Sequence, residues 1–466
     1  MATKLILIVG LLIAKAAFSQ DGADRDKIAA SQTGASPIYF ETLNMSIPAV
    51  ERGNYNNEQE CSVRGGLPRF LTKVNSGKEV VVAFIGGSIT QSNFGYRLQT
   101  AKYMEQTYAQ AKFKWINAGV SGTGTELGAF RIQEQVLNHR PDLIFIEFAV
   151  NGAYPDGMEG MIRQAIKRNP DVEICLIYTI LNGQSAIYQK NELPLNIVGL
   201  ERVAAYYDLP AVNLGMEASS LEAAEKLIWK GNSQTANPHQ ILFSEDGIHP
   251  STVGGNLYAS AIARALKKME SVKQPKKSQL PKPLITANWD DATMVDAAML
   301  ENKDWQLIAT ADHPNLKKFS PWFSAVLTAN KPGASFSFRF KGDMVGVFDI
   351  GGPEVGQLEW TIDGKPVKLN KEKQGSFSYY QTSDAAMADP LNRFNAYCNN
   401  RYRGQFDVIK VPEGEHLVTV TLSAQQANKL AILPEDQRSD IVSNPKKYDQ
   451  TVIYLGRILL RGNIIK

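Results

Sequence analysis

Short apolar runs alternate with longer amphipathic stretches through the middle of the chain. Residues 79–85, 143–150 and 172–180 are almost continuously apolar, as expected of strands buried on both faces. The remaining elements are shorter strands at 113–117 and 211–214, and helices at 94–110, 126–138, 157–168, 195–207, 221–229 and 254–269. Strands that alternate with helices indicate a parallel sheet with helices on both faces. Residues 64–271 are therefore predicted to form an α/β domain.

The hydrophobic period changes after a stretch rich in Pro and Lys. Residues 272–284 show no periodicity and are predicted to be a linker. Beyond it, apolar positions recur every second residue, as in 335–341 and 416–423. Asp363-Gly364 lies between two such runs and is a strong hairpin signal. Residues 285–466 are predicted to form an all-β sandwich or jelly roll.

The N-terminus has the pattern of a targeting segment. Lys4 precedes an apolar run at 5–14, and small residues follow, so residues 1–19 are predicted to be a secretory signal peptide. The run is shorter than the roughly 20 apolar residues that cross a bilayer, and no membrane span is predicted elsewhere. We expect a periplasmic or extracellular protein. Residues 20–63 are polar and are predicted to be a tether or an arm that lies on the body of the protein.

Composition narrows the possible partners and cofactors. The 466 residues are 44% hydrophobic with a formal net charge of +3, which fits a globular chain without the basic surface that binds nucleic acid. Cys175 lies in an apolar run and is predicted to be buried and inert, whereas Cys61 and Cys398 could pair if the fold brings them together. No Cys/His cluster has the spacing of metal ligands, so no metal or cofactor is predicted.

Candidate catalytic residues follow the predicted strands. Ligands bind beyond the carboxyl ends of the strands in open α/β sheets. Ser88 follows the first strand, Gly119 ends the second, and Asn151 follows the third. The motif Asp246-x-x-His249 lies in the loop before the last helix.

These groups are the ones that ester hydrolysis needs. A Ser hydroxyl requires a base, which His249 can provide, and Asp246 can hold the imidazole in one tautomer. The backbone N–H groups of Ser88 and Gly119 and the Asn151 amide can form an oxyanion hole. Taken singly, each residue has a simpler explanation as a turn residue, a helix cap or a loop histidine. Four such blocks, in order at one edge of one sheet, favour catalysis.

The four blocks resemble those of the SGNH, or GDSL, hydrolase superfamily. The similar segments are residues 85–90, 117–119, 149–151 and 246–250. This resemblance implies a flavodoxin-like, three-layer α/β/α fold and a catalytic Ser88, with oxyanion donors from Ser88, Gly119 and Asn151. Gly87 and Gly152 depart from the family pattern, which commonly has Asp at both positions. The α/β-hydrolase motif Gly-x-Ser-x-Gly is not matched, because Thr90 occupies its last position.

The two-part layout resembles that of secreted bacterial carbohydrate esterases. This similarity implies a serine esterase that removes short acyl groups, O-acetyl above all, from an acylated glycan through an acyl-enzyme. The β-domain resembles a carbohydrate-binding domain. Trp322, Phe323, Trp360, Tyr379 and Tyr380 could stack on sugars, although a core role is favoured for each. Residues 392–403 could line a glycan groove or only cap the sandwich.

Two other functions stay open at this level. One is a lipid esterase of the same superfamily, against which the lack of an apolar lid-like stretch argues. The other is an inactive protein that only binds glycans. The sequence does not specify the glycan, the position of the ester or the oligomeric state.

Overall fold

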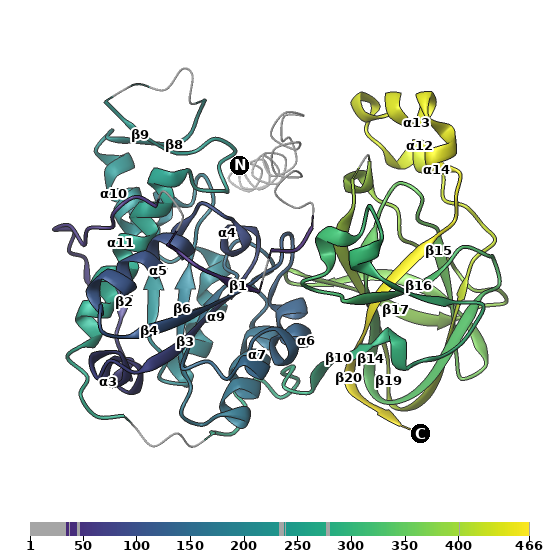
Figure 1. Ribbon diagram of the computed structural model, residues 1–466, viewed down its shortest axis with the longest axis horizontal. Helices are drawn as coiled ribbons and strands as arrows, with labels where there is room; N and C mark the ends of the chain where they lie inside the picture. Colours follow the sequence, from purple (N-terminus) through teal and green to yellow (C-terminus); the bar gives the residue numbers. More distant parts are fainter. Residues whose placement is uncertain are drawn as a thin grey trace, which may run out of the picture.

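The computed structural model describes residues 34–36, 38–43, 47–232, 237, 239–275, 280–399 and 401–465. The predicted signal peptide lies outside these residues. The described chain forms an α/β domain and a C-terminal all-β region that lie side by side (Figure 1). The predicted α/β class of the first part and the predicted all-β class of the second part are both confirmed.

Five parallel strands form the centre of the α/β domain. They are β3 (Glu79–Gly86), β4 (Lys112–Gly119), β5 (Leu143–Glu147), β6 (Glu173–Tyr178) and β7 (Ala211–Asn213). Their order is β4-β3-β5-β6-β7, which is the flavodoxin-like order. The order reverses between β3 and its two neighbours, so the site is expected beyond the carboxyl end of β3.

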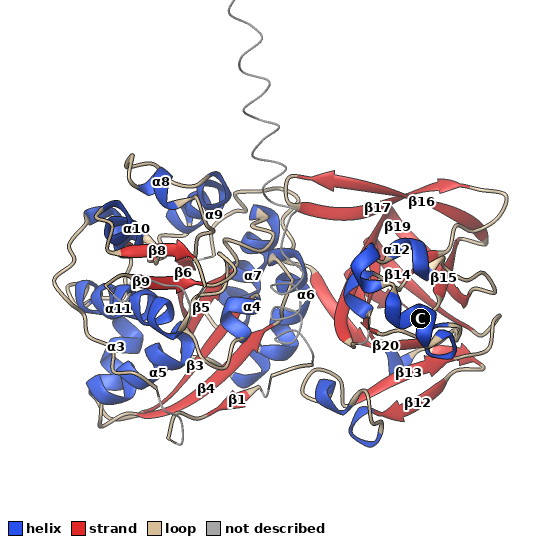
Figure 2. Cartoon of the chain, turned by 90° about the horizontal axis from the view of Figure 1, so that it is seen from above, coloured by secondary structure: helices blue, strands red, loops and turns tan. Residues whose placement is uncertain are grey.

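Helices cover both faces of this sheet, with α5 and α11 on one face and α6 and α7 on the other (Figure 2). The helices of the domain are α3 (Pro68–Asn75), α4 (Ser88–Gln91), α5 (Tyr96–Thr107), α6 (Thr125–Gln135), α7 (Pro155–Arg168), α8 (Ser185–Tyr188), α9 (Leu195–Tyr206), α10 (Met216–Ala223) and α11 (Thr252–Met269).

One predicted helix is wrong. Residues 221–229 were expected to be helical, but α10 ends at Ala223, and β8 (Leu227–Lys230) pairs in parallel with β9 (Ile241–Ser244). Glu225 adopts a left-handed backbone with φ 57°, which stops the helix. Leu227 and Trp229 are both buried, so the apolar positions here alternate with a period of two.

The segment predicted to be an arm closes both edges of the sheet. Strand β1 (Tyr39–Phe40) pairs antiparallel with β4 at one edge. Strand β2 (Cys61–Ser62) pairs antiparallel with β7 at the other. These short strands cover edges that would otherwise expose unpaired backbone groups.

Strands of the all-β region belong to one hydrogen-bonded network with three long members, β14 (Ser335–Gly351), β19 (Arg403–Leu422) and β20 (Ile453–Ile465). The other strands are β10 (Ala292–Asp296), β11 (Glu301–Lys303), β12 (Gln306–Ala309), β13 (Ala325–Ala329), β15 (Gln357–Ile362), β16 (Lys365–Gln374), β17 (Phe377–Asp384) and β18 (Leu391–Asn392). The short helices α12 (Lys429–Ile432), α13 (Ser439–Ser443) and α14 (Pro445–Tyr448) precede β20.

Two sequence expectations for this region are met. The predicted hairpin joins β15 to β16, with Asp363 at φ 54° and Gly364 at φ 77°. Positive φ at both turn residues is the type I′ pattern. The core role favoured for the aromatic residues is confirmed for Trp322, Phe323 and Trp360, which are buried.

The two parts share an apolar contact and an ion pair. Phe377 of β17 lies 5.1 Å from the Tyr154 ring and 4.8 Å from the Trp289 ring. Arg457 of β20 donates to both carboxylate oxygens of Glu134 on α6, at 3.0 and 2.7 Å. One cluster of buried apolar residues therefore continues from the α/β domain into the β region.

The three cysteines are buried and free, so Cys61 and Cys398 do not pair. Burial raises the pKa of both thiols to about 11, which keeps them protonated at neutral pH. Cys175 is buried, as predicted. Among the described helices, none is long and apolar enough to cross a membrane.

Candidate active site

Ser88, His249 and Asp246 form a continuous hydrogen-bonded chain. Nε2 of His249 lies 2.7 Å from Oγ of Ser88, and Nδ1 lies 2.6 Å from Oδ2 of Asp246. Ser88 is the first residue of α4, directly after β3, and the other two residues lie on one loop between β9 and α11. The fold thus brings together three residues that the sequence separates by up to 161 positions.

The loop fixes the orientation of the Asp246 carboxylate. Its Oδ1 accepts hydrogen bonds from the backbone N–H groups of Ile248 and His249, both at 2.8 Å, and from Oγ of Ser244 at 2.9 Å. Burial raises the pKa of Asp246, but the hydrogen bond and charge of His249 and these backbone donors outweigh burial and hold the pKa below its usual value. The carboxylate is therefore ionised wherever His249 must act as a base.

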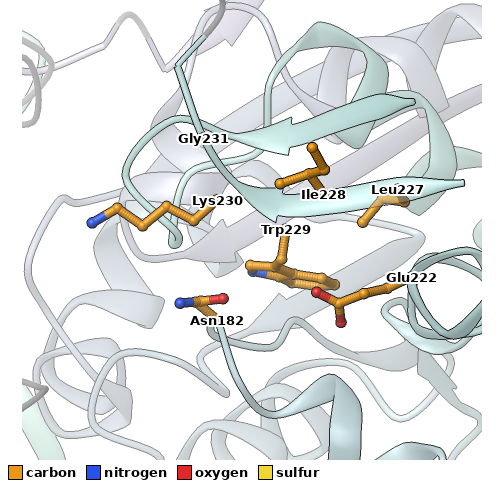
Figure 3. Close-up of a pocket in the computed structure, with 7 residues that line it drawn as sticks. All are labelled: Asn182, Glu222, Leu227, Ile228, Trp229, Lys230 and Gly231. Atoms are coloured by element: carbon orange, nitrogen blue, oxygen red, sulfur yellow. The ribbon is translucent and has the colours of Figure 1, made fainter. Parts of the chain in front are cut away.

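The buried indole of Trp229 stabilises this loop through a hydrogen bond to its backbone. Nε1 of Trp229 donates to the carbonyl of Gly247 at 3.2 Å, and the backbone N–H of Asn182 donates to the same oxygen at 2.9 Å. Trp229 and Asn182 also line a surface pocket of about 620 Å³. Figure 3 shows the Trp229 indole beside Asn182 and Glu222. Because the sequence pattern was assigned to a helix here, the support from Trp229 was not predicted.

Two of the predicted oxyanion donors are free to act. The N–H of Ser88 is at the first position of α4, where a helix offers no internal acceptor. Nδ2 of Asn151 is buried and has no hydrogen-bond partner among the described residues. A Cβ at position 87 would collide with this Nδ2, so a side chain there would require the Asn151 amide to move.

Gly119 has a structural role in addition to the predicted one. Its N–H donates to Oδ1 of Asn117 at 3.0 Å, so it would have to exchange partners to bind an oxyanion. A Cβ at this position would overlap the backbone of Thr90 and Gln91. The absence of a side chain lets β4 approach the helix that carries Ser88.

Two buried carboxyl groups near the site were not predicted. Glu147 ends β5 and accepts hydrogen bonds from Thr90 at 2.9 Å and Thr179 at 2.6 Å. Burial raises the pKa of Glu147. Burial also raises the pKa of Glu126, to about 7, against the opposing effect of two backbone N–H groups. A charged residue inside the apolar run at 143–150 was the available signal for Glu147.

A cavity of about 990 Å³ opens beside the triad. Ser88, Asp246 and His249 form part of its wall, and Ser36 reaches it from the N-terminal segment. Much of the remaining lining is apolar and comes from Ile89, Phe94, Ile241, Leu242, Pro250 and Val253. Among the described residues, no group of three or more His, Cys, Asp or Glu could hold a metal ion.

Comparisons with known proteins agree with this fold. Residues 84–256 match the GDSL-like Lipase/Acylhydrolase family. The whole fold is similar to a two-domain esterase active on acetylated mannans, co-crystallised with mannopentaose, with 20% identity and a TM-score of 0.60. That match covers 90% of this chain and 99% of the other.

Two further solved structures give no additional evidence about the fold. A second crystal structure described as a two-domain esterase active on acetylated mannans gives the same TM-score of 0.60 at 20% identity, covering 88% of this chain and 98% of the other. An acetylxylan esterase from Geobacillus stearothermophilus covers 40% of this chain and 94% of its own, with 18% identity and a TM-score of 0.32. No curated protein matches the sequence. The α/β domain, with its strand order and the four blocks it brings together, is similar over residues 84–256 to the GDSL-like lipase/acylhydrolase family.

Proposed function

We propose that this protein is a serine esterase that hydrolyses short acyl esters, chiefly O-acetyl groups, on a glycan. The observation that carries the proposal is the hydrogen-bonded chain from Ser88 through His249 to Asp246. Such a chain activates a hydroxyl that is otherwise a weak nucleophile at neutral pH.

The reaction would proceed in two steps. His249 takes the proton of Ser88 as Oγ attacks the ester carbonyl, and then donates it to the leaving sugar oxygen, which leaves an acyl-enzyme. Water, deprotonated by His249, releases the carboxylic acid and restores Ser88. The N–H of Ser88 and the amide of Asn151 would bind the oxyanion in both steps. The third donor is the N–H of Gly119 if it leaves Asn117.

Two observations support a glycan substrate. The same two-part fold, over nearly the full length of both chains, occurs in an esterase active on acetylated mannans. The N-terminal pattern of a secretory signal peptide would place the enzyme in the periplasm or outside the cell, where polysaccharides are found.

Hydrolysis of 4-nitrophenyl acetate tests the mechanism. We expect turnover by the wild type and none measurable with Ser88→Ala, because no other hydroxyl lies within hydrogen-bonding distance of Nε2 of His249 among the described residues. Ser76→Ala is the matched control, since Ser76 lies before β3 at the opposite end of the sheet. Near-normal turnover by Ser88→Ala would end the assignment, and acetate release from a panel of acetylated polysaccharides tests the glycan.

The apolar cavity favours a second candidate, an esterase for longer acyl chains. An acetyl group fills only a small part of about 990 Å³. A series of 4-nitrophenyl esters from acetate to decanoate separates the two. We expect kcat/KM to fall with chain length for an acetylesterase, and a rise toward the longer esters would establish the alternative.

A further inference from the structure

Strand β19 of the all-β region delivers a guanidinium group to the loop beside the active site. A Cβ at Gly122 would lie 2.9 Å from Nη2 of Arg403, the first residue of β19. Gly122 itself has a left-handed backbone with φ 72°. The two parts of the molecule therefore meet here, at the loop that follows β4.

This loop lies between the nucleophile and the Asn151 turn. On one side, the N–H of Val120 donates to the carbonyl of Gly86 at 3.0 Å, and the N–H of Ser121 donates to Oε1 of Gln91 at 2.7 Å. On the other side, a Cβ at Gly124 would lie 2.7 Å from the Asn151 carbonyl. Arg403 thus lies against the loop that follows Gly119 and packs against the Asn151 turn.

The Arg403 guanidinium has no acceptor among the described residues. Its Nε is fully covered and makes no hydrogen bond, although part of the residue stays accessible. Its neighbour is the Tyr397 ring, 4.8 Å away and 45% exposed. The titratable groups that act on Arg403 are Cys398, Tyr397 and Arg401, and none of these is a carboxylate. Burial lowers the pKa of Arg403.

Arg131 and Arg97 also have one unbonded buried nitrogen each, but other nitrogens of these two guanidinium groups donate to acceptors, which those of Arg403 do not do among the described residues. Arg393 binds the carboxylates of Asp349 and Asp407. Arg131 donates to the backbone carbonyls of Gly86 and Ala118. A largely buried cation without a partner is unfavourable, so such groups normally have one. An anion brought by the substrate would complete this site.

We propose that Arg403, with the Tyr397 ring beside it, binds the carboxylate of an acidic sugar, so that the substrate is an acylated glycan that contains uronate residues. The planar guanidinium matches a carboxylate with two parallel hydrogen bonds, which a neutral sugar hydroxyl cannot reproduce. Tyr397 would offer its exposed face to the sugar ring. The position of the ester relative to this carboxylate rests on the proposed function, but binding of the carboxylate does not.

Calorimetric binding of unesterified trisaccharides tests the proposal without requiring turnover. The probes are trigalacturonate, trimannuronate, neutral galactotriose and a sulfated galactotriose. We expect at least one uronate trisaccharide to bind the full-length wild type, and Arg403→Gln to weaken that binding about 10- to 100-fold, as expected for the loss of hydrogen bonds to a charged group. Arg403→Lys keeps the charge but loses the planar pair of donors. Its affinity for the uronate should therefore lie between those of the wild type and Arg403→Gln.

Arg339→Gln is the matched control, because Arg339 is an exposed residue of β14 in the same region. It should leave uronate binding unchanged, and thermal unfolding should confirm that all variants are folded. Equal uronate affinity of wild type and Arg403→Gln would overturn the proposal. So would wild-type affinity for galactotriose equal to that for the uronates, or binding of the sulfated probe alone. Uronate binding through Arg403 in a wild type that hydrolyses no ester would reject the proposed function and keep this subsite.

Discussion

At the residue scale, the Asn151 amide is a polar group held in place without a partner. Its Nδ2 is buried and unbonded among the described residues, which is unfavourable in the resting enzyme. An oxyanion that forms only in the transition state would satisfy it. We therefore expect Asn151→Ala to lower kcat for 4-nitrophenyl acetate about 10²–10³-fold with little change in KM. Asn138→Ala, at an exposed position, is the control, and an unchanged kcat for Asn151→Ala would remove the amide from the oxyanion site.

Glu126 should make stability depend on pH. The fold raises its pKa to about 7, whereas an unfolded chain has the ordinary value of about 4.3, so the folded state binds more protons between these values. Stability from this residue is complete below the unfolded pKa and is lost as pH rises through the folded one. Glu126→Gln keeps the shape of the protonated Glu126 side chain but cannot ionise. We expect its melting temperature to exceed that of the wild type by a margin that grows from pH 5 to pH 8; a constant margin would contradict this.

Which site residues could be predicted depends on where their partners lie in the chain. Ser88 and Asn151 follow strands whose carboxyl ends share one edge, and Asp246 and His249 are three residues apart on one loop. The contact of Arg403 with the Gly122 loop joins the two parts of the molecule, and no periodicity encodes it. The lack of a hydrogen-bond partner for Nδ2 of Asn151 likewise depends on its packing against Gly87, which the sequence pattern does not encode.

At the scale of elements, the short N-terminal strand β2 is attached by a buried ion pair. Glu60, just before β2, is fully buried and accepts from Nε and Nη2 of Arg264 on α11 at 2.9 and 2.6 Å. Removing one charge from a buried pair typically costs about 3–5 kcal/mol, but Arg264 keeps a second ion pair with Glu217 at 2.8 Å, so we expect a smaller loss here. We expect Glu60→Gln to lower the melting temperature by several degrees. Glu58→Gln, an exposed neighbour in the same turn, should have little effect, and equal stability of both variants would argue against the role of this pair.

The predicted elements differ from the observed ones where local pattern and long-range pairing disagree. The buried parallel strands were predicted closely, because short continuous apolar runs in an α/β domain usually form strands that are buried on both faces. Strands β1 and β2 have two residues each and are stabilised by their pairing with β4 and β7, so their sequences carry no periodic signal. Strand β8 has only 4 residues, too few for the spacing of apolar positions to separate a strand from a helix, and its pairing with β9 decides its structure.

At the scale of the whole molecule, the contact between the two parts should decide how the protein unfolds. Phe377 is fully buried between Tyr154 and Trp289, and Arg457 bonds to Glu134 across the same boundary. A shared core of this kind couples the parts, so we expect one calorimetric transition for the wild type.

The double variant Phe377→Ala/Arg457→Gln tests this coupling. Replacing a buried Phe by Ala lowers the free energy of unfolding by about 3–5 kcal/mol. Here the lost packing belongs to the contact between the two parts. We expect the single transition to split into two, because each part retains most of its own core. Phe338→Ala is the control, since Phe338 packs in a separate cluster within the β region. This variant should lower the melting temperature while the transition stays single. Two transitions in the wild type would contradict the coupling of the two parts. Arg403 would then reach the Gly122 loop across a weak contact.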